Sequence, residues 1–225
     1  TYFSLRKETI PSPPAPEITI IFALSSVSLQ AQNFFDNSSL DLTTGLNFST
    51  VTDLSGHFGY NVGVRFNKSI KDFEKGNLYG NIGMLYSKKG ANLDNDGIGL
   101  ITGKSNLTIN YLEFPIHAGG SYPIGKKVSL FADAGPYIAF ATSGDLRGVE
   151  NIFSDNGLKK IDLGLGFRFG LAFKEKVRLS FEYESGLVNI NNGLEDDKFR
   201  PDNSSIANIK NLNFMINLSW RIWHK

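Results

Sequence analysis

The sequence predicts an all-β fold: an eight-stranded antiparallel up-and-down β-barrel of the kind that crosses a membrane. Three observations predict it. Bulky apolar residues alternate with small or polar residues over eight segments, and the connections between these segments alternate between short and long. The last segment carries Trp220 and Trp223 close to the end of the chain. Short turns at one end, long loops at the other and an even strand count are typical of transmembrane β-barrels.

The composition agrees with strands. The chain has 225 residues, with 23 Gly and 18 Phe, and Gly disfavours helices while aromatic residues favour sheets. Its mean hydropathy of −0.15 is too polar for a bundle of membrane helices, but it suits a barrel in which only every second residue meets lipid. The net charge of +1 predicts no nucleic-acid partner, and the absence of Cys excludes disulfides and thiolate metal sites.

The first 32 residues differ from the remainder. Residues 18–29 form an apolar run of twelve, shorter than the ~20 residues that a membrane-spanning helix needs. With Arg6 and Lys7 before it and small residues up to Ala31 after it, the run resembles a signal peptide cleaved near Ala31. A tail followed by a buried strand is the alternative. We therefore divide the chain into a signal-peptide-like segment, residues 1–32, and a barrel domain, residues 33–225.

The clearest strand pattern covers residues 161–173. One parity is entirely bulky and apolar, whereas the other holds Asp162, Gly164, Gly166, Arg168, Gly170 and Ala172. Strict alternation over this length indicates a strand and not a helix. The same pattern recurs in seven further segments, at residues 40–48, 58–67, 77–88, 106–118, 127–140, 177–184 and 212–222.

The polar parity is predicted to face the lumen, because small residues and paired charges suit the narrow interior of an eight-stranded barrel. The nearly balanced charges indicate an internal, salt-bridged plug with a structural role. This interior polar cluster comprises Arg65, Glu113, Asp133, Asp162, Arg168, Arg178, Glu182, Glu184 and Arg221. The lysines, Lys89 among them, concentrate in the predicted connections.

The connections are predicted at about residues 49–57, 68–76, 89–105, 119–126, 141–158, 174–176 and 191–208. Residues 89–105, 141–158 and 191–208 are long and rich in Asn, Asp and Gly, as outer loops are, and the shorter connections between them suit periplasmic turns. Both chain ends then lie on the periplasmic side. The long loops are the segments we expect to meet envelope partners.

Four segments resemble one family. Residues 111–116 read YLEFPI and are similar to the Y-L-E-[IFV]-P-[LI] segment of PorT-like outer-membrane β-barrel proteins of Bacteroidetes-type bacteria. Residues 135–140 (GPYIAF), 162–166 (DLGLG) and 183–191 (YESGLVNIN) resemble further segments of that family in the same order. The resemblance implies the barrel fold and an outer-membrane location, and it implies no catalytic residues.

Candidate chemistry is sparse. His57 is predicted at the outer end of the second strand, the height at which outer-membrane lipid hydrolases place a Ser–His site. Residues 94–97 (DNDG) resemble the start of a calcium loop, but position 105 is Ser where that loop needs Glu. We expect no catalytic residues, no metal site and no cofactor.

The leading hypothesis is a non-catalytic structural or accessory protein, exported to the bacterial outer membrane, with outer-membrane lipid and loop-bound envelope proteins as partners. A barrel that binds a small apolar ligand or a lipid is an alternative, and an apolar lumen would favour it. A lipid-modifying enzyme built on His57 and a narrow channel are further alternatives. Eight strands leave little lumen for free flow, which disfavours the channel.

Overall fold

The computed structural model describes residues 35–51, 55–92, 106–146, 149–150, 152–153, 157–192 and 209–225. The chain divides into two compact units, Thr1–Asp36 and Asn37–Lys225, and the second unit holds every strand described below. The predicted signal-peptide-like segment, residues 1–32, lies outside the described residues. No described helix is long and apolar enough to cross a membrane.

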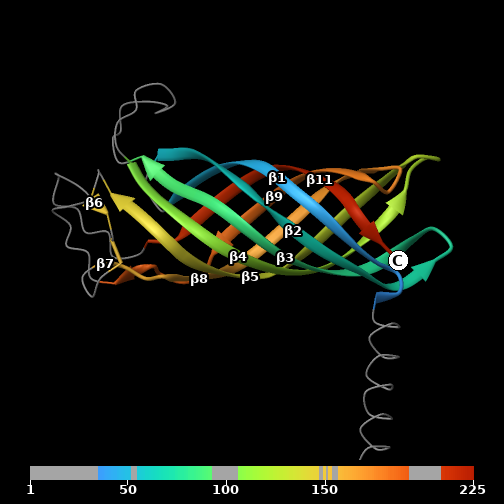
Figure 1. Ribbon diagram of the computed structural model, residues 1–225, viewed down its shortest axis with the longest axis horizontal. Helices are drawn as coiled ribbons and strands as arrows, with labels where there is room; N and C mark the ends of the chain where they lie inside the picture. The colour runs from blue at the N-terminus through green and yellow to red at the C-terminus, as the bar shows by residue number, and fades with distance from the viewer. Residues whose placement is uncertain are drawn as a thin grey trace, which may run out of the picture. The chain divides into compact units, whose positions relative to one another are not determined.

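Eight long antiparallel strands form a closed barrel (Figure 1). They are β1 (Ser38–Val51), β2 (Ser55–Phe73), β3 (Gly76–Asn92), β4 (Asn106–Pro123), β5 (Val128–Leu146), β8 (Ile161–Phe173), β9 (Val177–Gly186) and β11 (Asn211–His224). Short strands β6 (Val149–Glu150), β7 (Gly157–Leu158) and β10 (Asn191–Asn192) lie in the connections. The order of the long strands is β4-β3-β2-β1-β11-β9-β8-β5, and pairing of β4 with β5 completes the circle.

The first and last strands seal the barrel. Leu42 of β1 pairs with Trp220 of β11, and the backbone N–H of Ser38 donates to the carbonyl of Lys225 at 3.1 Å. A closed sheet leaves no strand edge unpaired, which a lipid environment requires. The predicted eight-stranded up-and-down barrel is therefore confirmed.

The strands are longer than their sequence pattern indicates. Strand β2 continues to Phe73, so the predicted connection 68–76 shrinks to a turn at Glu74 and Lys75. Strand β4 reaches Pro123, and its turn to β5 spans residues 124–127, where residues 119–126 were predicted. Residues 89–92 and 141–146 also belong to strands and not to loops. The predicted turn 174–176 is confirmed, with Lys174 and Glu175 at positive φ.

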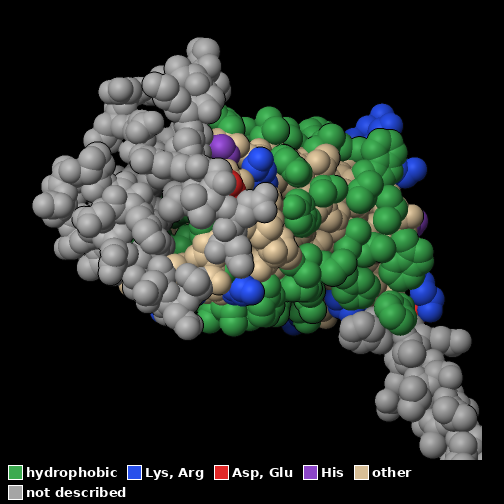
Figure 2. All heavy atoms as spheres, turned by 60° about the vertical axis from the view of Figure 1, so that its left-hand side comes forward, with side chains coloured by type: hydrophobic (Ala, Val, Ile, Leu, Met, Phe, Trp, Pro, Cys, Tyr) green, Lys and Arg blue, Asp and Glu red, His purple; other side chains and the backbone are tan. Residues whose placement is uncertain are grey.

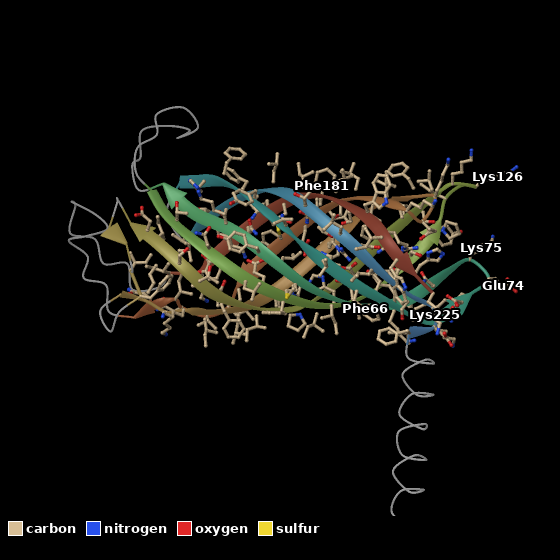
Figure 3. All side chains as sticks on the ribbon, viewed as in Figure 1. Phe66, Glu74, Lys75, Lys126, Phe181 and Lys225 are labelled. Atoms are coloured by element: carbon tan, nitrogen blue, oxygen red, sulfur yellow. The ribbon has the colours of Figure 1, made fainter. Side chains whose placement is uncertain are left out.

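The bulky parity faces outward, as the sequence predicts. Along β8, Asp162, Gly164 and Arg168 are buried, whereas Leu165 is 53% exposed. On the face shown in Figure 2, hydrophobic side chains cover much of the barrel wall, with Lys and Arg toward its ends. In Figure 3, Phe66 and Phe181 point away from the lumen. An apolar belt of this kind on a closed barrel suits the hydrocarbon core of a membrane.

Candidate functional site in and around the lumen

A buried ion pair crosses the middle of the lumen. Arg65 of β2 and Glu182 of β9 lie 2.6 Å apart, with side chains 1% and 0% exposed. Strands β1 and β11 separate these two strands in the sheet, so the contact is made through the interior. Asn217 of β11 donates to the same carboxylate at 2.9 Å. A buried charge needs this combination of an opposite charge and further hydrogen bonds.

A second buried network is centred on Asp133 of β5. Arg168 lies 2.7 Å from one carboxylate oxygen, and the hydroxyl of Tyr79 donates to that oxygen at 2.6 Å. The other oxygen lies 2.9 Å from Nδ1 of His117. Four strands thus meet at one carboxylate, which ties β3, β4 and β8 to β5.

Lys89 lies in the lumen, so its predicted place in a connection was wrong. It was placed among the connection lysines, but its side chain is 2% exposed and points into the lumen from β3. Its ammonium pairs with Glu113 of β4 and, at 2.8 Å, with Glu184 of β9. It also lies 5.0 Å from the centre of the Tyr137 ring. The predicted interior anions Glu113 and Glu184 therefore share a cation that the parity pattern missed, because β3 runs beyond its clear alternation.

Near the short turns, Asp41 of β1 lies between two arginines. Arg178 approaches it to 3.5 Å and Arg221 to 3.4 Å. The guanidinium of Arg178 also lies 5.4 Å from the centre of the Phe131 ring.

Asp162, at the other end of the lumen, accepts hydrogen bonds from Tyr137 at 3.0 Å and Asn211 at 2.9 Å. All nine residues of the predicted cluster thus contribute to the interior networks.

An apolar cluster occupies the loop end of the interior, a feature that the sequence analysis did not foresee. On β4, Leu107, Ile109 and Tyr111 continue the inward parity of Glu113 and are almost fully buried. The inward-facing residues are therefore polar at mid-height and apolar near the loops. Following the alternation of each strand to its end in the sequence would have predicted this change. The cluster contains Val51, Ala91, Leu107, Ile109, Tyr111, Tyr137, Ala139, Ile152, Leu158, Ile190 and Ile209.

Glycine makes room for the large interior side chains. A Cβ at Gly166 would lie 2.7 Å from Nε2 of His117, and one at Gly164 would lie 2.5 Å from the Tyr137 ring. A Cβ at Gly45 would lie 2.0 Å from the amide oxygen of Asn217. These glycines are small so that rings and amides from other strands can fill the lumen.

Of the residues considered for chemistry, the structure describes His57, on β2. His57 pairs with Ser49 across β1 and β2 and is partly buried. The Ser49 hydroxyl accepts from the Gly90 N–H at 2.8 Å and donates to the Gly90 carbonyl at 3.1 Å. Within the described part of the chain, no three His, Cys, Asp or Glu residues converge as metal ligands. Residues 94–97 lie outside that part.

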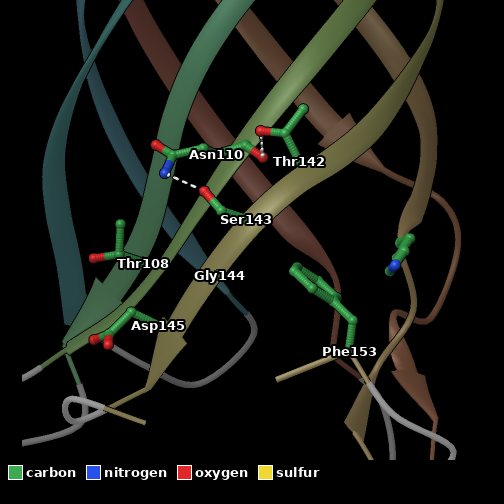
Figure 4. A pocket seen from close by; sticks show the side chains of 8 residues that line it. Thr108, Asn110, Thr142, Ser143, Gly144, Asp145 and Phe153 are labelled. Atoms are coloured by element: carbon green, nitrogen blue, oxygen red, sulfur yellow. Dashed lines mark hydrogen bonds between the residues drawn. The ribbon is translucent and has the colours of Figure 1, made fainter. Parts of the chain in front are cut away.

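The outer wall becomes polar at the loop ends of β4 and β5. Thr108 and Asn110 alternate with buried Leu107 and Ile109, so they face outward. They line a pocket of about 470 Å³ together with Thr142, Ser143, Gly144, Asp145, Phe153 and Lys160 (Figure 4). Asn110 donates to Ser143 at 2.8 Å. This polar lining indicates that the two strands extend past the apolar belt into water.

A closed barrel with an apolar wall and a charged, filled lumen defines a small integral protein of the bacterial outer membrane. Residues 28–192 match the family described as outer membrane protein beta-barrel domain, and the chain belongs to this family. A search of curated proteins finds no match.

Solved structures share the architecture. The outer membrane enzyme PagL is 15% identical, with a TM-score of 0.51 over 81% of this chain and 99% of that chain. Neisserial surface protein A (NspA) is 11% identical, with a TM-score of 0.50 over 83% and 98%. Ail, the attachment invasion locus protein of Yersinia pestis, is 13% identical, with a TM-score of 0.41 over 82% and 97%. At these identities the first two show the fold alone.

Proposed function

We propose that the protein is a non-catalytic accessory protein of the outer membrane that meets other envelope proteins at its loop end. The observation that carries this proposal is the filled interior. The pair Arg65–Glu182 crosses the middle of the lumen, and the apolar cluster occupies its loop end. Among the described residues these contacts fill the lumen at two heights, which argues against a water-filled path and against an interior site for an apolar ligand. The proposal therefore assigns the interaction surface to the outer rim.

The outer rim offers long polar connections. Residues 93–105 and 193–208 join strands at that end and lie outside the described residues. Their sequences are rich in Asn, Asp and Gly, and long polar loops on a rigid scaffold are common sites of recognition. The polar wall around Asn110 and Ser143 adds a fixed surface near the loop ends of β4 and β5.

The test is loop replacement. Two variants carry a short Gly-Ser linker in place of residues 94–104 or of residues 194–207, and a third carries substitutions in the short turn at Glu74 and Lys75 as the matched control. All are expected to fold, seen as a shift in electrophoretic mobility between unheated and boiled samples. Crosslinking in cells should recover envelope proteins with the wild type and the turn variant, and fewer with the loop variants. Equal recovery from all of them would contradict the proposal.

We further propose that the chain belongs to the PorT-like branch of its family. The support is that three of the four resembling segments meet inside the barrel. Tyr111 accepts a hydrogen bond from Asn211 at 3.2 Å, and the same Asn211 amide donates to Asp162, which also accepts from Tyr137. Segments far apart in the sequence thus build one buried network. A profile of the branch in which these positions varied independently would contradict this assignment.

A further inference from the structure

The lipid-facing wall has one region of small side chains. Elsewhere the outward parity of the long strands is dominated by Leu, Ile, Val, Phe, Tyr and Trp. On β3, β4 and β5 it instead holds Gly80, Ala118, Gly120, Ala132 and Ala134. These residues are adjacent, because Gly80 pairs with Ala118, Ala118 with Ala134, and Gly120 with Ala132.

Two of these small residues, Gly120 and Ala132, form the floor of an apolar groove in the half of the wall near the short turns. Along one row across five strands, Leu78 pairs with Gly120, Gly120 with Ala132, Ala132 with Phe169, and Phe169 with Phe181. The small residues Gly120 and Ala132 therefore lie between bulky side chains, with Leu78 on one side and the two Phe rings on the other. The groove encloses about 740 Å³, and the stacked rings of Phe169 and Phe181, 5.6 Å apart, form one side.

The end of the groove at the short turns is cationic. Phe73 and Lys75, at the turn between β2 and β3, line the groove together with Tyr122 and Leu130. The ammonium of Lys71 lies 5.3 Å from the centre of the Phe73 ring, which places a second cation at the same end. Of the two nearby acids, Asp72 accepts a hydrogen bond from Ser69 at 2.9 Å, and Glu74 is exposed at the tip of the turn. Figure 3 shows Glu74, Lys75 and Lys126 together at this end of the barrel.

We propose that this groove is a binding site for one anionic phospholipid of the periplasmic leaflet. An acyl chain lies on Gly120 and Ala132 against the Phe169 and Phe181 rings, and the phosphate lies between the ammonium groups of Lys71 and Lys75. The short turns mark the periplasmic side in barrels of this kind. Apolar burial alone does not drive this binding, because bulk lipid is equally apolar. Close packing in the groove and the two cations distinguish the bound lipid from its neighbours.

The test compares two lipids on the purified protein. Native mass spectrometry of the detergent-solubilised barrel, titrated with phosphatidylglycerol or phosphatidylcholine of identical acyl chains, counts the bound molecules. The wild type should retain one phosphatidylglycerol in preference to phosphatidylcholine. Each lysine near an anionic headgroup is worth roughly a fivefold change in affinity, so Lys71→Gln and Lys75→Gln together should remove most of the preference. Glu74→Gln should increase it.

Variants in the groove separate packing from charge. Ala132→Leu fills the floor and should weaken the binding of both lipids equally. The matched controls lie on the far side of the barrel, around β1: Leu42→Phe adds bulk to the wall of β1, and Lys225→Gln removes a cation at the end of β11, the strand that pairs with β1. Both controls should bind like the wild type.

Three results would overturn the proposal. They are equal binding of the two lipids by the wild type, retention of the preference in the double lysine variant, and loss of binding in the Lys225→Gln control. Disulfide-linked dimers formed by Ala132→Cys in the cell membrane would instead assign the groove to a second copy of the chain.

Discussion

The lumen and the wall of this barrel use alternate residues of the same strands in opposite ways. Along β8, Arg168 is buried against Asp133, whereas Leu165, three residues earlier, is exposed on the wall. A charge in the lumen has partners on several strands, and a charge on the wall would have only lipid. Small residues also differ: Gly166 makes room for a ring in the lumen, and Ala132 leaves a groove on the wall. The effect of a substitution therefore depends first on whether the residue faces the lumen or the lipid.

The largest effect is expected from removing a charge in the lumen. In Lys89→Met, the carboxylates of Glu113 and Glu184 remain buried without their shared cation. Breaking a buried pair costs about 3–5 kcal/mol, and the free energy of unfolding in a urea titration in vesicles should fall by that amount. The same change at Lys88, the neighbouring residue of opposite parity, is the control and should be nearly neutral. Similar losses in both variants would remove the distinction between lumen and wall.

Adding a charge to the wall should come next. Leu165→Arg places a guanidinium in lipid, and the free energy of unfolding should fall by ~2–4 kcal/mol if residue 165 lies at the midplane of the bilayer. Leu165→Phe keeps the position apolar and is expected to unfold like the wild type in the same titration. An Arg variant as stable as the Phe variant would mean that this parity does not face lipid.

Adding bulk to the lumen should have a smaller effect. In Gly166→Leu, the new side chain meets the imidazole of His117 and forces the neighbouring strands to adjust, which costs about 1–3 kcal/mol of unfolding free energy. Adding His117→Ala to the same chain frees that space and should recover part of the loss. A Gly166→Leu variant with unchanged stability would show that the lumen has unfilled space at this height.

The smallest effect is expected from adding the same bulk to the wall. In Ala132→Leu, the side chain enters the groove and meets no packed neighbour, so the free energy of unfolding should stay within about 0.5 kcal/mol of the wild type. Gly166→Leu, measured in parallel, gives the contrast. A loss as large as that of the lumen variant would indicate that the groove is packed in the folded chain.

The sequence was sufficient to predict the fold because period two is a local property of each strand. Alternation over residues 161–173 separated the two parities, the small and charged residues of one parity indicated that it faces the lumen, and the structure agrees. Strand ends were harder, because β2 continues through Lys68 and Lys71 to Phe73 after its clear alternation stops. The sequence predicted which charged residues face the interior, but not which of them pair with each other. Arg65 meets Glu182 and not a nearer acid, because barrel closure and strand stagger decide which heights coincide.

Two further features depend on register and could not be read from single strands. Lys89 becomes a lumen residue only when β3 is extended to Asn92. The floor of the groove forms because Gly120 of β4 pairs with Ala132 of β5, beside the further small residues Gly80, Ala118 and Ala134. Each of these small residues is unremarkable in its own segment.

The central claim is that the lumen is filled and that the barrel therefore acts through its surface. Single-channel recording of the folded protein in planar bilayers tests it most directly. We expect no current above that of the protein-free bilayer, both for the wild type and for the Ala132→Leu variant of the wall. A stable, ohmic conductance that changes when Glu182→Gln removes the charge of the Arg65 partner would contradict the claim.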